Sequence, residues 1–219
     1  MRIIATTFLA IFLSISQMIN TGCTQKQGMD FDKHTSSLEQ EVISELNLAR
    51  QHPKKYAAFL EQERPYYVGK FIKRPGEVTI ITKEGVSAVD EAIRYLKKAN
   101  SLPALKYSKG LSRAAMDHVR DQGKRGALGH KGSDGSQPAD RVNRYGDWRW
   151  TVGENISYGR DVARDIVIGL IVDDGVPGRG HRDNIFNPKF RIVGVACGGH
   201  KTYGTMCVMN YAGDFIEQK

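Results

Sequence analysis

The chain has 219 residues, of which 40% are hydrophobic and 26% charged, values ordinary for a water-soluble globular protein. A chain of this length can bury a sizeable core as one domain, so folding needs neither a metal nor a dense set of disulfides. Its formal net charge of +8 favours anionic partners such as lipid head groups, cell-wall polymers or acidic glycans.

The N-terminal segment has the pattern of a secretory signal peptide. Arg2 supplies one early positive charge, an apolar run extends from Ile3 to Ile15, and small residues precede Cys23. A buried N-terminal helix would need a polar face, which this run lacks. We therefore predict that residues 1–22 are a signal peptide and that the protein is exported. Export separates it from nucleic acid, and no nucleic-acid-binding motif is present, so we expect no nucleic-acid partner.

The end of this segment also resembles the cleavage box of bacterial lipoproteins. Thr21, Gly22 and Cys23 follow its pattern, whereas Asn20 stands where a leucine-like residue is usual. We predict that Cys23 is lipidated and that residues 23–36 form a polar tether to the membrane. The expected location is the bacterial cell envelope, as a lipoprotein or a secreted protein.

The remaining chain alternates helical and extended patterns. Residues 62–83 are expected to be a loop with a short strand near Val78–Ile81, and the glycine-rich stretch 123–135 a loop. Residues 152–158 and the last 30 residues have strand character. Apolar residues at helical spacing predict helices around residues 38–49, 56–60, 86–96, 108–122, 138–145 and 162–172. Helices and strands do not alternate regularly, which indicates an α+β fold.

Two cysteines remain after Cys23. If the apolar stretches that hold Cys197 and Cys207 form an antiparallel hairpin centred on Thr202, the two residues lie opposite one another. Exported proteins commonly oxidise such pairs, so we favour a disulfide over two buried thiols.

Three glycine-containing segments carry the side chains best suited to chemistry. They are Gly129–Gly135, Gly153–Ile156 and Gly180–Ile185, and each sets an ionisable side chain near a glycine. Glycine permits unusual backbone angles, which suits a loop that presents a side chain into a cleft. The same composition also describes ordinary surface turns, so each segment alone is weak evidence.

Taken in order, these segments resemble the CAP (SCP/PR-1-like) domain. Supporting stretches are Leu46–Arg50, Leu102–Leu105 and His130 followed by Asp134 and Gly135. The resemblance covers most of the chain and places the domain at residues 37–216. It implies a three-layer α-β-α sandwich with a shallow cleft lined by two histidines and two acids.

The resemblance also implies which residues line that cleft. The histidines would be His130 and His181, and the first acid Glu154. The second acid is usually a glutamate, whereas here Asp173 or Asp174 occupies the region.

Two imidazoles in one cleft can bind a divalent metal, zinc first, through ring nitrogens. A carboxylate such as Glu154 would fix the tautomer of a ligating ring. A hydrogen-bonded polar cluster without metal is an equal alternative. For three other residues we expect plainer roles, with His118 packed inside, His200 on the surface and Arg141 in an ion pair with Asp140.

Three hypotheses of function follow. The first is a non-enzymatic extracytoplasmic binding module with a metal-capable cleft, whose ligand is a lipid, a glycan or a protein. The second is a metal-dependent hydrolase or peptidase of the cell envelope, with Glu154 as the base. The third is a structural envelope protein with a vestigial cleft. No nucleophile motif such as Gly-x-Ser-x-Gly is present, so we favour a protein that is not an enzyme.

Overall fold

A computed structural model of the chain describes residues 35–218, and its centre is a four-stranded sheet. The strand order is β4 (Lys106–Tyr107), β6 (Ile192–His200), β7 (Gly204–Glu217) and β5 (Gly146–Tyr158). Strand β4 runs parallel to β6, and the other neighbours are antiparallel. Strand β5 is therefore an edge strand. The predicted signal peptide, Cys23 and most of the tether lie outside the described residues.

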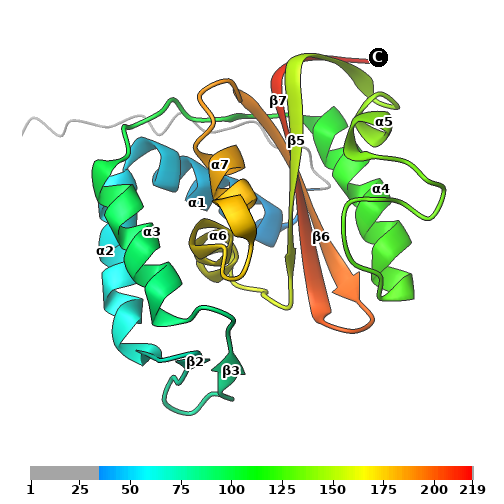
Figure 1. Ribbon diagram of the computed structural model, residues 1–219. Coiled ribbons are helices and arrows are strands. Elements are labelled where there is room, and N and C mark those ends of the chain that lie inside the picture. The colour runs from blue at the N-terminus through cyan, green and yellow to red at the C-terminus, as the bar shows by residue number, and fades with distance from the viewer. Residues whose placement is uncertain (1–34, 219) are drawn as a thin grey trace, which may run out of the picture.

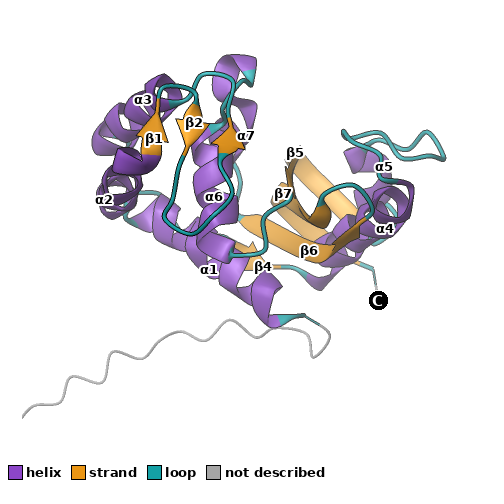
Figure 2. Ribbon diagram, turned by 90° about the horizontal axis from the view of Figure 1, so that it is seen from below, coloured by secondary structure: helices purple, strands orange, loops and turns teal. Residues whose placement is uncertain are grey.

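Helices cover both faces of this sheet (Figure 1). One face carries α4 (Lys109–Arg125) and α5 (Pro138–Val142). The other face carries α1 (Ser37–Gln51) and α6 (Ala163–Val172), with α7 (Gly180–Ile185) beside α6. Helices α2 (Pro53–Glu63) and α3 (Val86–Lys98) pack outside these (Figure 2). The predicted α+β sandwich of three layers is confirmed.

Burial explains these layers. Strand β7 is continuously buried from Met206 to Ala212, because helices cover both of its faces. Helix α6 is apolar on nearly all sides and is buried between the sheet and the outer helices. None of the helices within residues 35–218 has the length and apolar character needed to span a bilayer.

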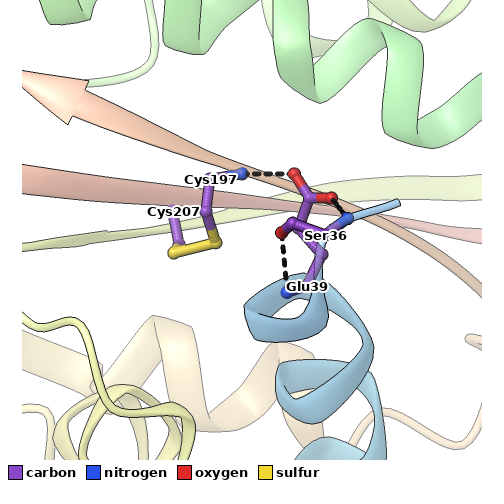
Figure 3. Close-up of a disulfide and its surroundings, with 4 residues drawn as sticks. All are labelled: Ser36, Glu39, Cys197 and Cys207. Atoms are coloured by element: carbon purple, nitrogen blue, oxygen red, sulfur yellow. Dashed lines mark hydrogen bonds between the residues drawn. A yellow bond between two sulfur atoms is a disulfide. The ribbon is translucent and has the colours of Figure 1, made fainter. Parts of the chain in front are cut away.

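The hairpin of β6 and β7 contains the predicted disulfide. His200 pairs with Gly204, which puts Thr202 at the centre of the turn, and Cys197 pairs with Cys207. Their sulfur atoms are bonded, with the Cα atoms 4.1 Å apart. The backbone N–H of Cys197 also donates to Glu39, which belongs to the capping box of α1 (Figure 3). The start of α1 is thereby attached to the sheet.

Long-range hydrogen bonds join three of the sequence segments that carry the resemblance. The side chain of Asn47 on α1 bonds both the N–H and the carbonyl oxygen of Leu105. The buried guanidinium of Arg50 donates to the carbonyl oxygens of Ile185, at the end of α7, and Phe190. Helix α1 therefore fixes the segment that leads out of α7.

Residues 64–83 contain more structure than the predicted loop. After the short 3₁₀ helix Arg64–Tyr66, the segments β1 (Tyr67–Val68), β2 (Phe71–Ile72) and β3 (Ile80–Ile81) form a small antiparallel sheet. Two-residue strands are too short to give a periodic signal, which is why only the third was expected.

A close backbone contact holds this small sheet to α3. The N–H of Val86 donates to the carbonyl oxygen of Gly69 at 3.0 Å. Gly85 has a φ of +70°, and a Cβ there would lie 1.9 Å from the same oxygen. Only glycine allows this approach.

Strand β5 is longer than expected and is bulged. It begins at Gly146 instead of residue 152, and its register with β7 shifts between Arg149 and Val152. Trp150 occupies the bulge with a φ of +68° and is 71% exposed. The bulge interrupts the apolar alternation, which conceals the first half of the strand in the sequence.

Candidate functional site

A buried carboxylate on the edge strand holds the first candidate histidine. Glu154 lies on β5 with its side chain 1% exposed. Its Oε1 is 2.9 Å from Nδ1 of His130, and its Oε2 accepts a hydrogen bond of 2.8 Å from the guanidinium of Arg141. Arg141 on α5 is itself buried. Burial of a carboxylate is costly unless the group is paired and hydrogen-bonded, and Arg141 supplies that pairing.

A second carboxylate holds the other candidate histidine. Asp173 ends α6 in a left-handed conformation and is 3% exposed. Its Oδ1 lies 2.6 Å from Nδ1 of His181, and its Oδ2 accepts the backbone N–H of the same residue at 2.9 Å. This two-point contact fixes both the ring and the start of α7.

Two asparagines connect the His130–Glu154 pair with the His181–Asp173 pair through hydrogen bonds. Asn155 follows Glu154 on β5 and donates to the carbonyl oxygen of His181 at 2.9 Å. Asn184 on α7 donates to the carbonyl oxygen of Glu154 and to Oδ1 of Asn155. The ring of His130 and the backbone of His181 are thus attached to consecutive residues of the edge strand.

The same type of contact orients both histidine rings. Each ring uses Nδ1 to contact a buried carboxylate. A carboxylate accepts Nδ1–H and leaves the Nε2 lone pair free to bind a metal or accept a proton. The side chains of His130 and His181 are 47% and 23% exposed, so both rings are open to solvent.

One of the two histidines borders a cavity. The cavity has a volume of about 290 Å³ and lies between the small sheet, α6 and β5. Apolar side chains including Tyr67, Ile72 and Leu170 line it, together with Arg160 and the His181–Asp173 pair. His130 is not among its lining residues. The cavity can hold an apolar group beside an oriented imidazole.

The possible metal ligands are few. Within residues 35–218, no group of three or more His, Cys, Asp or Glu side chains has the arrangement needed to hold a metal ion. On each ring Nδ1 contacts a carboxylate, so Nε2 is the ring nitrogen without such a contact. Structural zinc sites have four protein ligands and catalytic ones three.

Comparison with known families decides what kind of domain this is. The profile of the family described as CAP, the cysteine-rich secretory proteins, matches residues 45–211. The chain belongs to the CAP family. The matched range contains His130, Glu154, Asp173 and His181.

Individual relatives are distant. The uncharacterized protein YkwD of Bacillus subtilis (strain 168) is 26% identical over 139 residues, covering 62% of this chain and 51% of that protein. The chain thus spans about half the length of this curated relative. An extracellular SCP-domain protein of Bacillus anthracis str. Ames is 19% identical over 58% of this chain and 37% of its own, with a TM-score of 0.42. An outer surface protein of Borrelia burgdorferi is 15% identical over 61% of this chain and 91% of its own, with a TM-score of 0.43.

Arg141, which forms the ion pair with Glu154 in this CAP domain, has a different partner from the one that we predicted. Sequence proximity suggested an ion pair between Asp140 and Arg141, and this prediction is wrong. Asp140 instead accepts the N–H of Gln137 at 2.8 Å, at the start of α5, while Arg141 points to Glu154. Adjacent helical residues face different directions, so they rarely pair with each other.

The loop that leads to His130 is held by buried polar groups. His118, which is fully buried as predicted, contacts the carbonyl oxygen of Gly129 through Nε2 at 2.9 Å. Gln122 donates to the same oxygen, and the hydroxyl of Tyr158 accepts the N–H of Gly129. Nδ1 of His118 has no partner in the described part of the chain. These contacts fix the backbone one residue before His130.

His200 belongs to the same support. We expected it on the surface, and this is wrong, because the residue is only 3% exposed. Its Nδ1 accepts the N–H groups of Thr202 and Tyr203, which requires that Nε2 carry the proton given to the carbonyl oxygen of Ala127. The ring therefore connects the hairpin turn to the loop before His130.

Proposed function

We propose that this CAP domain is an exported, non-enzymatic binding module whose two oriented histidines can hold a divalent cation, with zinc the best fit. One observation carries the proposal: the Nδ1 atom of each ring contacts a buried carboxylate, Glu154 or Asp173. This arrangement is the usual second layer of a metal-binding histidine. A bound zinc ion would supply Lewis-acid character for a ligand oxygen. Two protein donors imply modest affinity and exchange with solvent or ligand.

The ligand is proposed to be an extracytoplasmic lipid, glycan or protein. The cavity beside His181, which has apolar and charged lining residues, supports a ligand with an apolar part. Export is supported by the predicted signal peptide and by the cysteine pair, which forms a disulfide. We propose a bacterial cell-envelope location, with Cys23 lipidated.

The state of Glu154 argues against the hydrolase alternative. A general base must reach a water molecule with a free oxygen. Both oxygens of Glu154 are occupied, by His130 and Arg141, and the side chain is 1% exposed. We therefore expect no turnover of a mixed peptide library with zinc. Turnover that disappears in Glu154→Ala would establish the hydrolase instead.

Calorimetric titration with zinc tests the binding proposal. The test compares the chain that begins at Thr24 with its His130→Ala/His181→Ala variant, and His52→Ala serves as control because His52 is exposed. We expect the double variant to bind zinc at least about tenfold more weakly, since it lacks both imidazoles, and the control to match the parent. Equal binding by all three proteins would reject the metal assignment.

A further inference from the structure

The small sheet bears apolar side chains on both of its faces. The strand register places Val68, Phe71 and Ile81 in one row across the three strands, and Tyr67, Ile72 and Ile80 in the next. Successive residues of a strand point to opposite faces. The second row lines the cavity beside His181. The first row consequently belongs to the opposite, outer face, although Ile81 also contributes to the lining of the cavity while it is 76% exposed.

This outer row is exposed to an unusual degree. Val68 is 54% exposed, Phe71 41% and Ile81 76%, and the nearby Val78 is 88% exposed. With Ile80, residues 68–81 contribute five of the ten large hydrophobic side chains exposed within residues 35–218. Scattered apolar residues on a surface need no explanation, whereas a contiguous group marks a contact surface.

Two lysines without an ion-pair partner among the described residues lie beside the apolar row. Lys70 and Lys73 flank Phe71, and Nζ of Lys73 lies 5.5 Å from the centre of its ring. Neither lysine forms an ion pair in the part of the chain that the structure describes. The one acid in residues 64–83 is Glu77, which is 3.6 Å from the guanidinium of Arg74. The outer surface therefore combines an apolar row with two positive charges beside Phe71.

The position of the sheet makes this surface available. It lies at one end of the molecule, near the ends of α2 and α3 (Figure 1), and its inner side borders the cavity next to β5. The N–H of Thr82 donates to the carbonyl oxygen of Lys70 at 2.8 Å, and Gly69 is bonded to the start of α3. The surface thus protrudes on a fixed backbone.

We propose that this surface, formed by Val68, Phe71 and Ile81 with Lys70 and Lys73, docks on an anionic lipid bilayer. Apolar side chains at such a site enter the boundary between head groups and acyl chains, while lysines meet the lipid phosphates. The proposal does not depend on metal binding or on lipidation of Cys23.

Charge favours a lipid surface over a second copy of the chain. In a two-fold dimer the same patch faces itself, so Lys70 and Lys73 of each copy would approach those of the other. Like charges across a contact oppose association. An anionic bilayer complements both the apolar and the charged parts of the patch.

Co-sedimentation with vesicles tests the proposal. The chain that begins at Thr24 lacks Cys23 and contains every described residue. It is mixed with vesicles of equal parts phosphatidylglycerol and phosphatidylcholine, or of phosphatidylcholine alone. We expect at least about tenfold tighter binding to the anionic vesicles.

Two variants and two matched controls assign the contact. F71S/I81S removes apolar groups, K70E/K73E reverses two charges, and each should weaken binding to anionic vesicles by about tenfold or more. V162S and K124E/K201E alter exposed residues elsewhere and should bind as the parent does. All altered side chains are exposed, so melting temperatures should stay close to the parent's.

Three results would overturn the proposal. They are equal binding to both kinds of vesicle, undiminished binding by F71S/I81S or K70E/K73E, and an equal loss in the controls. Sedimentation equilibrium supplies the fourth criterion. A parent dimer that F71S/I81S converts to a monomer would mean that a second copy covers this face.

Discussion

At the scale of single residues, Asp173 and Asp174 are neighbours that contact different parts of the molecule. Asp173 binds the ring and backbone of His181. Asp174 accepts the backbone N–H groups of Glu84 and Gly85, just before α3. The sequence left both as candidates for the second acid of the cleft, and the contacts assign Asp173 to the histidine.

This difference gives a prediction that rests on the proposed metal site. Asp173→Asn removes the charge beside His181 but tolerates the left-handed backbone, so zinc affinity should fall by about tenfold or more. Asp174→Asn should leave zinc affinity unchanged, because its partners are backbone groups before α3. Calorimetric titration of both variants measures this. Equal losses would show that Asp173 has no special role.

The partner of Arg141 is a second example of a contact that nearby residues in the sequence do not predict. Its partner Glu154 is 13 positions away, and both side chains are buried. No spacing rule for helices or strands links a residue on α5 to one on β5. The contact exists because α5 packs against the edge strand, which is a tertiary event.

At the scale of elements, the β6–β7 hairpin has an internal cross-link and also contacts other parts of the molecule. Its disulfide joins residues separated by 10 positions. A cross-link of this loop length stabilises a fold mainly by restricting the unfolded chain.

We predict that removal of this disulfide lowers the free energy of unfolding by a measurable amount. The Cys197→Ala/Cys207→Ala variant should lose about 2–3 kcal/mol of unfolding free energy while keeping the fold, because the strand register continues on both sides of the pair. Urea denaturation of parent and variant measures this. Under dithiothreitol the parent should approach the variant, and a parent that is unaffected by the reductant would contradict the prediction.

At the scale of the whole molecule, one buried histidine, His118, makes the free energy of unfolding depend on pH. Burial lowers the pKa of His118 below its usual value of 6.5, because charging the ring there is unfavourable. Glu154 and Asp121 favour the charged ring and Arg141 opposes it, and burial outweighs the acids. The folded state therefore prefers neutral His118, whereas the unfolded chain accepts a proton near pH 6.5.

The sign of the pH effect follows from that difference. The stability linked to neutral His118 is present above about pH 6.5 and is lost as the pH falls toward the lower pKa of the folded state. Unfolding free energies from urea titrations at about pH 7.5 and pH 5 should fall more for the parent than for His118→Gln, which cannot be protonated. The difference should approach about 1.4 kcal/mol per unit of pKa shift. Equal falls in both proteins would exclude His118 as the source.

The sequence alone determined the structural features that depend on residues close together in the chain. Helical spacing predicted α1, α3, α4 and α6, and the break at Pro53 separates α1 from α2. The spacing around Thr202 predicted the pairing of Cys197 with Cys207. These features follow from periods of two and 3.6 residues, which the chain carries along its own length.

Only the tertiary structure decided which distant groups meet. It selected Asp173 for His181, joined Arg141 to Glu154 and buried His200. It also formed a small sheet from strands too short to have a period, with one face on the cavity and the other exposed. Such contacts depend on how helices and strands pack together, and residue spacing along the chain does not encode that packing directly.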